Sequence, residues 1–189
     1  MSTLTLITAG PYSTIQDKGR TGQQALGVLE GGAMDKDALR IANHLVGNED
    51  NAGALELFLG GTRLLVSEAR MVSLAGSTAD NAIIRSKNGV ETLLPSGQSA
   101  CLDAGAELFV PPLRHTNTVI IAVEGGFDLP PLYGSVATSA NAKLGGLDGR
   151  LLADGDVLPL GPAAHLSPSP LILADLSIFK KNEIIRCVT

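Results

Sequence analysis

The sequence contains very few aromatic residues and only two cysteines. Its 189 residues include four phenylalanines, two tyrosines and no tryptophan, so valine, isoleucine, leucine and alanine must fill the interior, and such a core is typical of sheets. Cys101 and Cys187 lie far apart in apolar contexts, and no secretion signal precedes them. We therefore expect two reduced packing residues rather than a disulfide, in a cytoplasmic protein.

Long apolar runs and an excess of basic charge are also missing. No stretch reaches the roughly 18 apolar residues that a membrane span requires, so we expect no membrane partner. The formal net charge is -5, and the 14 Lys and Arg residues are scattered along the chain. Because nucleic-acid binding needs clustered basic residues, we expect no nucleic-acid partner.

Several motifs that indicate catalysis are absent. No Gly-x-Gly-x-x-Gly follows a strand, and the chain has neither a P-loop nor a Gly-x-Ser-x-Gly nucleophile elbow. The three histidines, His44, His115 and His165, are isolated and lack the spacing that places ligands around a metal ion. We expect no metal site, and no nucleotide site of the Walker type in this chain.

Short apolar or alternating runs dominate what is present. Each run is closed by glycine, proline, asparagine or aspartate, which is typical of an antiparallel β-barrel or sandwich. The Asn88-Gly89 pair lies between two such runs and predicts a hairpin. The predicted strands span residues 4–8, 54–59, 62–66, 71–75, 81–85, 90–94, 99–102, 107–110, 118–123 and 156–160.

One amphipathic helix is predicted from about residue 36 to residue 46. Its apolar residues recur three and four positions apart and so form one stripe along the helix. Asp35 precedes the helix and is a suitable N-cap. The same carboxylate is equally a candidate for ligand contact, and the sequence leaves both roles open.

Two segments rich in glycine and charge interrupt the strand pattern. Residues 16–35 have few large apolar side chains and are expected to lie outside the core, while residues 124–150 have a similar composition. Their glycines permit positive φ and let backbone N–H groups approach a ligand closely. The segments are either ordinary surface loops or two walls of one cleft, and the second interpretation predicts that Arg20 and Ser135 share a polar pocket.

The composition changes after residue 160. Residues 161–170 are rich in proline and serine and are interpreted as a linker, so that one domain ends near residue 160. Apolar runs follow at residues 171–176 and 183–188, with no later strand to pair with them. We expect these runs to expose apolar surface and to favour association with a related protein or with a second copy.

Six ordered motifs carry a family resemblance over residues 3–160. They are Gln16-Asp17-x-Gly19-Arg20, Gly32-Ala33-Met34-Asp35, residues 39–48, Ala54-Leu55-Glu56, residues 123–135 and Gly145-Gly146-Leu147-x-Gly149-Arg150. Together they resemble the biotin-dependent carboxyltransferase and allophanate hydrolase subunit 2 family. Bacterial members of that family include the C component of 5-oxoprolinase and the antagonist of the sporulation-kinase inhibitor.

The resemblance implies a fold and a domain organisation. It implies a mainly β fold, a cyclophilin-like antiparallel β-barrel over residues 1–160 with one main helix at about 36–46. Family members carry a second barrel after the first. Residues 161–189 are therefore interpreted as a linker and the start of a missing or truncated second barrel, and the chain as a first half.

The resemblance also implies a function. The chain would be the C component of an ATP-dependent 5-oxoprolinase, which opens the lactam of 5-oxoproline to glutamate together with an A component and a kinase-inhibitor-like B component. The complex would bind ATP, not necessarily through this chain. In this scheme the catalytic residues are Arg20, Asp17 and Asp35, and the substrate-binding residues are Gln16, Gly31, Gly32, Met34, Ser135 and Thr138.

Two alternatives stay open within the same fold. One is a carboxyltransferase component of the urea carboxylase type, which acts on urea or a similar amide and needs biotin delivered by other chains. The other is a regulatory protein that binds a kinase-inhibitor-like partner and performs no chemistry.

Overall fold

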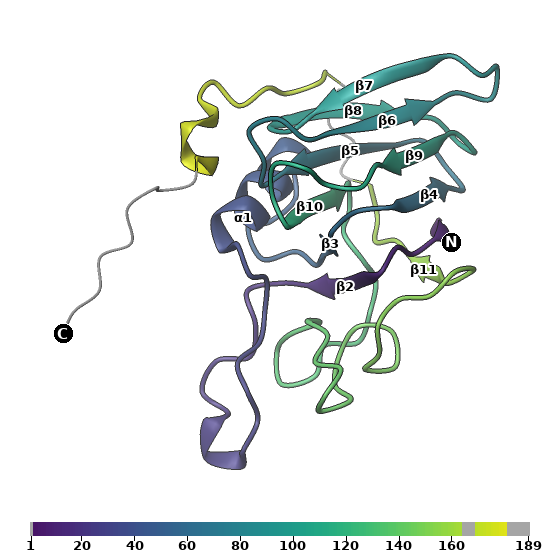
Figure 1. The fold of residues 1–189 in the computed structure, drawn as a ribbon. Coiled ribbons are helices and arrows are strands. Elements are labelled where there is room, and N and C mark those ends of the chain that lie inside the picture. The colour runs from purple at the N-terminus through teal and green to yellow at the C-terminus, as the bar shows by residue number, and fades with distance from the viewer. Residues whose placement is uncertain (1, 164–168, 181–189) are drawn as a thin grey trace.

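The computed structural model describes residues 2–163 and 169–180, which form two antiparallel sheets and one α-helix (Figure 1). The six-stranded sheet has the order β11-β1-β4-β9-β6-β7, and the five-stranded sheet has the order β2-β3-β10-β5-β8. The predicted mainly β class with one main helix is confirmed. The strands are β1 (Thr3–Thr8), β2 (Tyr12–Gln16), β3 (Ala54–Phe58), β4 (Thr62–Val66), β5 (Arg70–Ala75), β6 (Asn81–Arg85), β7 (Glu91–Pro95), β8 (Gln98–Leu102), β9 (Glu107–Val110), β10 (Thr118–Val123) and β11 (Val157–Pro159).

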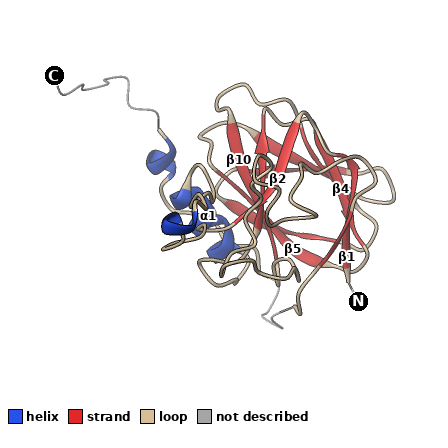
Figure 2. Ribbon diagram, turned by 90° about the horizontal axis from the view of Figure 1, so that it is seen from below, coloured by secondary structure: helices blue, strands red, loops and turns tan. Residues whose placement is uncertain are grey.

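The two sheets face each other across an aliphatic core (Figure 2). Buried leucines from both sheets meet there, among them Leu55, Leu64 and Leu108. Among the described strands, hydrogen bonds do not join the two sheets into one closed ring. Instead, part of the segment between β10 and β11 lies beside the edge strand β2, where the Leu152 N–H donates to the Ser13 carbonyl at 2.9 Å. The second glycine-rich segment also lies along this edge, where the Thr138 N–H donates to the Ile15 carbonyl at 2.8 Å. The described strands thus form two facing sheets rather than the closed barrel that the resemblance suggests.

Helix α1 (Lys36–Leu45) covers the outer face of the five-stranded sheet (Figure 2). Its buried stripe includes Ala38, Leu39 and Ala42, which pack with Ala75 and Ile120 of the sheet. Small and aliphatic side chains on both surfaces allow the helix to lie close to the strands. The predicted boundaries of the helix differ from the observed ones by one residue.

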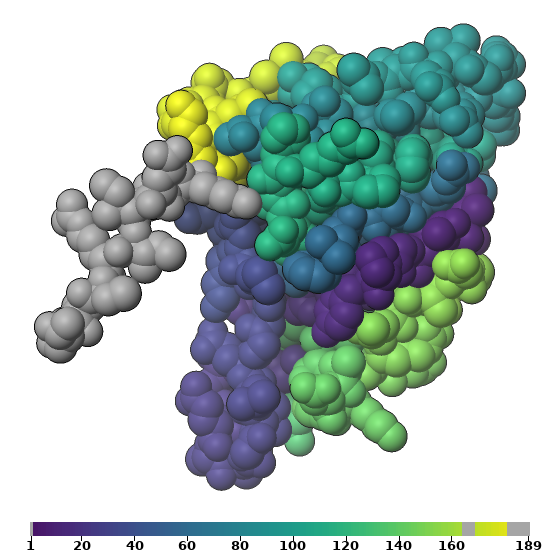
Figure 3. Space-filling model, viewed as in Figure 1, coloured from purple at the N-terminus to yellow at the C-terminus, as the bar shows by residue number. Residues whose placement is uncertain are grey.

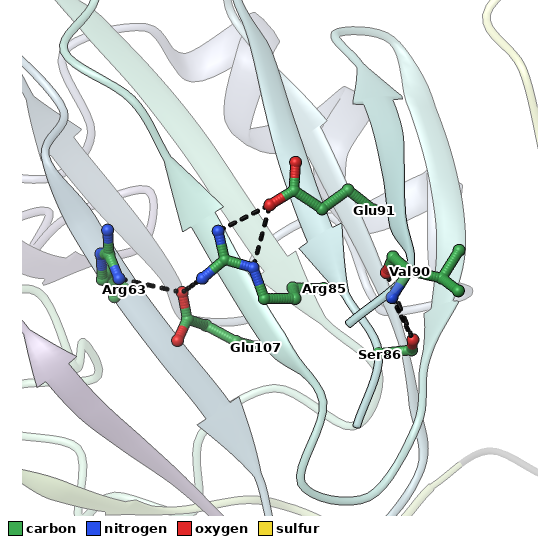
Figure 4. Close-up of polar contacts among 6 residues, drawn as sticks. All are labelled: Arg63, Arg85, Ser86, Val90, Glu91 and Glu107. Atoms are coloured by element: carbon green, nitrogen blue, oxygen red, sulfur yellow. Dashed lines mark hydrogen bonds and ion pairs between the residues drawn. The ribbon is translucent and has the colours of Figure 1, made fainter. Parts of the chain in front are cut away.

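The predicted hairpin at Asn88-Gly89 joins β6 and β7. Gly89 has a φ of 79°, in the left-handed region that an Asn-Gly turn requires. Next to the turn, Arg85 donates from Nε to Glu91 Oε1 at 2.9 Å and pairs with Glu107 at 3.7 Å (Figure 4). These charged groups are solvated, and pairs of this kind contribute little to stability.

Strand β2 was not predicted from the sequence. Its sequence Tyr-Ser-Thr-Ile-Gln does not alternate between apolar and polar residues, because Ser13 and Thr14 are buried beside Ile15. Ser13 Oγ donates to the Ala9 carbonyl, and Thr14 Oγ1 accepts from Gln16 Nε2 at 3.0 Å. Internal hydrogen bonds thus allow polar side chains to occupy positions where the pattern expects apolar ones.

The segment after β11 is partly packed. Leu171 and Leu173 make backbone hydrogen bonds to Ser99 and Gly97, at 2.9 and 2.7 Å, so this run does find a partner, contrary to expectation. It still exposes Ile172. The predicted run at 183–188 and Cys187 lie outside the described residues. Cys101 is free, but it is exposed on β8 and so is not the packing residue that was expected.

Candidate functional site

The two glycine-rich segments meet at the carboxylate of Asp17, which follows β2. Ser135 Oγ donates to Oδ1 at 2.7 Å, the Val136 N–H donates to Oδ2 at 2.7 Å, and the Gly19 N–H donates to Oδ1 at 2.7 Å. Asp17 is only 3% exposed. Its carboxylate therefore connects the first segment to the second. The two segments converge near Arg20 and Ser135 as predicted, but both side chains are buried, and an open polar pocket shared by them stays a prediction.

Arg20 lies in the same junction and is 1% exposed. Its Nη2 donates to the Ala137 carbonyl. Within the described residues, Nε and Nη1 have no hydrogen-bond partner. A Cβ at Gly145 would overlap both Nη2 and the Ala137 carbonyl, so only glycine allows the guanidinium to reach this place. Two buried N–H groups without partners are unusual, because each carries a desolvation cost.

Gln16 and Thr138 complete the junction. Gln16 Nε2 donates to the Thr138 carbonyl at 3.2 Å, and the Ile15 N–H donates to Thr138 Oγ1 at 3.3 Å. The Thr138 N–H in turn donates to the Ile15 carbonyl at 2.8 Å. The expectation that residues from 16 onward lie outside the core is therefore wrong for Gln16, Asp17 and Arg20. Hydrogen bonds to both carboxylate oxygens allow the burial of Asp17, which composition alone argues against. Gln16 and Arg20 each bond to the second segment through one nitrogen, while Gln16 Oε1 and Arg20 Nε and Nη1 have no partner among the described residues.

Residues 18–33 form a projection that we call the finger (Figures 1 and 3). At its base the Arg20 N–H donates to the Glu30 carbonyl at 2.7 Å. Its tip carries a short 3-10 helix and the exposed side chains of Leu26 and Leu29. The predicted site residues thus lie where the finger leaves the sheets.

Gly31 and Gly32 belong to the returning arm of the finger. Gly32 has a φ of 93°, and a Cβ there would lie 2.7 Å from the Lys18 carbonyl carbon. A Cβ at Gly19 would lie 2.6 Å from the Gly31 carbonyl oxygen. Gly19 and Gly32 are required because two backbone arms touch there. The oxyanion-binding role of Gly31 and Gly32 stays a prediction.

Met34 lies at a pocket of about 260 Å³ on the outer face of the five-stranded sheet. We call this space the Met34–Glu56 pocket. The Met34 N–H donates to Glu56 Oε1 at 2.7 Å. Two family motifs, Gly32-Ala33-Met34-Asp35 and Ala54-Leu55-Glu56, therefore meet here. The residues that line the pocket are Tyr12, Met34, Glu56, Phe58 and Thr118.

The Glu56 carboxyl has a perturbed pKa. Burial raises the pKa, the hydrogen bond from the Met34 N–H lowers it, and the nearby charge of Asp35 raises it, with a net upward shift from the ordinary value of 4.5. A raised pKa in a concave site is a common property of functional carboxyl groups. Glu56 was not predicted from the sequence as a site residue. A charged residue within the apolar run Ala-Leu-Glu-Leu-Phe could have indicated it.

Asp35 performs the role of an N-cap. Its Oδ1 accepts a hydrogen bond from the Ala38 N–H at 2.8 Å. It also lines a cavity of about 510 Å³ with, among others, Ser77, His115 and Thr116. The cap is confirmed, and the catalytic role of Asp35 stays a prediction.

The described residues contain neither a cluster of metal ligands nor a membrane-spanning helix. In the parts of the chain that the structure describes, no three His, Cys, Asp or Glu side chains are grouped as metal ligands. Across the same residues, no helix has the length and apolar character needed to span a bilayer.

Comparison with known proteins identifies relatives. A family model for the carboxyltransferase domain, subdomain A and B, matches residues 26–189. The chain is 41% identical to the C component of 5-oxoprolinase from Escherichia coli over 158 aligned residues. This alignment covers 84% of this chain and 49% of the relative. It is 35% identical to urea amidolyase of Lachancea kluyveri over 161 aligned residues, and this alignment covers 85% of this chain and 8% of the relative.

A solved structure shares the fold. The crystal structure of the K. lactis urea amidolyase superposes with a TM-score of 0.77 at 30% identity, over 88% of this chain and 10% of that one. The chain thus spans about half the length of the 5-oxoprolinase component and a small part of each urea amidolyase. Since the family model covers most of the sequence, the chain belongs to the family of the carboxyltransferase domain, subdomain A and B.

Proposed function

We propose that this chain is the C component of an ATP-dependent 5-oxoprolinase complex. The observation that carries the proposal is the 41% identity to the C component of the Escherichia coli 5-oxoprolinase over 84% of this chain. The corresponding protein of Haemophilus influenzae is 33% identical over 146 residues. The reaction is the opening of the lactam of 5-oxoproline to glutamate, with the A and B components as partners.

The chemistry requires activation of a stable amide. Resonance stabilises the lactam ground state, so coupling to ATP, bound by the complex, supplies the driving force. In this proposal the free Nε and Nη1 donors of Arg20 hold a carboxylate or phosphate oxygen by charge-assisted hydrogen bonds. Because Arg20 is buried, such contact requires the finger and the second segment to separate at their junction.

A second candidate function rests on a separate observation. The family model describes a carboxyltransferase domain, and urea amidolyase is a relative at 35% identity. In that case the substrate would be urea or a similar amide, with biotin supplied by another chain. Purification with companion chains separates the two cases, because one complex contains a relative of the 5-oxoprolinase A component and the other contains a biotin carboxylase.

The decisive experiment is an assay of the complex purified from its native source. Glutamate release from 5-oxoproline and ATP is the expected activity, and its absence in a complex that contains all companions would overturn the proposal. Arg20→Lys is expected to lower turnover by about two orders of magnitude, because lysine lacks the planar pair of donors. Arg85→Lys, an exposed arginine on the six-stranded sheet, is the matched control and should leave turnover unchanged.

A further inference from the structure

The Met34–Glu56 pocket has two kinds of wall. Tyr12 and Phe58 present aromatic rings, with centroids 6.4 Å apart and an interplanar angle of 80°. Met34 is 75% exposed, and its sulfur accepts a long hydrogen bond from Thr118 Oγ1 at 3.8 Å. A methionine side chain adapts its shape to what it contacts, so this wall can close around a small ligand.

The remaining wall is the carboxyl group of Glu56. Its Oε1 is occupied by the Met34 N–H. Among the described residues, no donor reaches Oε2, and no basic side chain acts on this carboxyl: burial and the charge of Asp35 both raise its pKa. The pocket therefore holds a partly buried acid that lacks a positive partner. Glu56 Oε2 is not one of the fully buried atoms that lack a partner, so it is accessible from the pocket and can accept a hydrogen bond from a ligand.

We propose that the Met34–Glu56 pocket binds a small alkylammonium ion. Its N–H groups would donate to Glu56 Oε2, and its charge would be stabilised by the faces of Tyr12 and Phe58. Asp35 adds a second negative charge close by, which further favours a cation. The same charges disfavour an anion such as a carboxylate, so the pocket differs in ligand class from the Arg20 junction.

The volume sets the size of this ligand. A space of about 260 Å³ is slightly below the usual range for drug-sized ligands, and it suits an amine of a few carbon atoms. The cation is supplied either by a free amine or by a lysine side chain of another protein, since both present the same alkylammonium group. The inference does not rest on the proposed function, because binding is measured on this chain alone.

Methyl NMR gives a direct test. The chain has three methionines, so labelling of their ε-methyl groups gives few signals, and Met34→Leu assigns the signal of interest. The buried Met71 serves as an internal reference. Titration with n-butylammonium should shift the Met34 methyl signal saturably, with butyramide binding about tenfold more weakly and butyrate not at all.

Two variants complete the test. Glu56→Gln keeps the shape of the side chain and should weaken butylammonium binding about tenfold, because the charge is lost. Glu49→Gln removes the same charge from an exposed position near the other end of helix α1 and should not change binding. The proposal is overturned if no saturable shift occurs, if butyramide binds as tightly as the amine, or if Glu56→Gln retains full affinity while folded.

A lysine derivative distinguishes the two sources of the cation. Nα-acetyl-lysine methylamide presents the same ammonium group on a peptide backbone. Equal affinity for this probe and for butylammonium would support recognition of a protein lysine. Binding about tenfold weaker would support a free amine, because the pocket would then exclude the peptide groups.

Discussion

Asp17 directly follows strand β2, and Glu56 lies on the neighbouring strand β3, but the two carboxylates have opposite surroundings. Asp17, at the end of β2, accepts three hydrogen bonds through both of its oxygens. Glu56, in β3, accepts one hydrogen bond through one oxygen and faces a pocket. Both residues belong to family motifs, so the presence of a motif does not by itself distinguish a structural carboxylate from a ligand-binding one. The two kinds of carboxylate are distinguished by the number of protein N–H and O–H groups that donate to each.

The same comparison separates the two halves of the predicted site. Residues of the Gln16-Asp17-x-Gly19-Arg20 motif are buried against the second glycine-rich segment, with the exposed turn of Lys18 between them. Met34 and Glu56 are accessible beside a pocket. We therefore expect mutations of Gln16 and Asp17 to act mainly on folding and mutations of Met34 and Glu56 to act mainly on binding. Arg20, which keeps two free donors among the described residues, is the buried residue proposed to act on turnover.

The largest effect is expected for Asp17→Ala. This change leaves the N–H of Val136, the hydroxyl of Ser135 and the N–H of Gly19 without their acceptor, and two of these three hydrogen bonds connect the two segments. We expect a loss of about 3–5 kcal/mol in the free energy of unfolding, measured by denaturant titration. A loss below about 1 kcal/mol would show that the junction is not structural.

Gly32→Ala tests the close approach of the two arms of the finger. The added Cβ would lie 2.7 Å from the Lys18 carbonyl carbon, at a φ of 93°. We expect a loss of about 2–4 kcal/mol in the free energy of unfolding. Gly22→Ala is the control: it also has a positive φ, of 78°, but nothing lies within 4 Å, so a loss of about 1 kcal/mol is expected. Equal losses for the two variants would contradict the packing of the arms.

Asp80→Asn extends the comparison to a third carboxylate. Burial alone would raise the pKa of Asp80, but hydrogen bonds from the Arg114 N–H, the Ser77 hydroxyl and the N–H groups of His115 and Thr116 lower it below 3.8. Because the unfolded state then binds more protons, this group contributes stability above pH 3.8 that is lost as the pH falls through the folded pKa. Asp80→Asn should cost about 1–3 kcal/mol at neutral pH and flatten the acid limb of a stability profile. An unchanged acid limb would contradict this assignment.

Glu56→Gln should have the smallest effect on stability and the opposite dependence on pH. The folded pKa of Glu56 is raised, so the folded state binds more protons and the wild type loses stability as the pH rises from 4.5 through the folded pKa. Glutamine removes this penalty, and the variant should be within about 1 kcal/mol of the wild type or slightly more stable at neutral pH. Thermal unfolding measured across this pH range checks the sign. A large loss at neutral pH would show that Glu56 is structural, like Asp17.

Much of the fold was predictable from local pattern. All of the described strands except β2 lie within one residue of their predicted boundaries, and helix α1, its Asp35 cap and the Asn88-Gly89 hairpin were found as expected. These features depend on residues close together in the chain, whose spacing and turn chemistry act locally. Strand β2 was missed because its buried polar side chains, including Ser13 and Thr14, break the alternation.

The candidate site was predictable only in part. The convergence of the segments around Arg20 and Ser135 was expected, but the burial of that junction was not. Hydrogen bonds between distant residues, such as Ser135 Oγ to Asp17 Oδ1, supply the partners that make burial tolerable, and no local pattern shows them. Glu56 was not selected because its exposure depends on which residues stand opposite it in β2 and β10.

The sequence by itself determined the class of fold, the position of the helix and the family to which the chain is related. Periodicity, turn residues and motifs depend on residues that are close together in the sequence, so they can be recognised without the structure. Only the tertiary structure decided which polar residues are satisfied and which face a pocket. The physical reason is that desolvation and hydrogen bonding depend on neighbours in space, and those neighbours come from segments more than a hundred residues apart, as for Asp17 and Ser135.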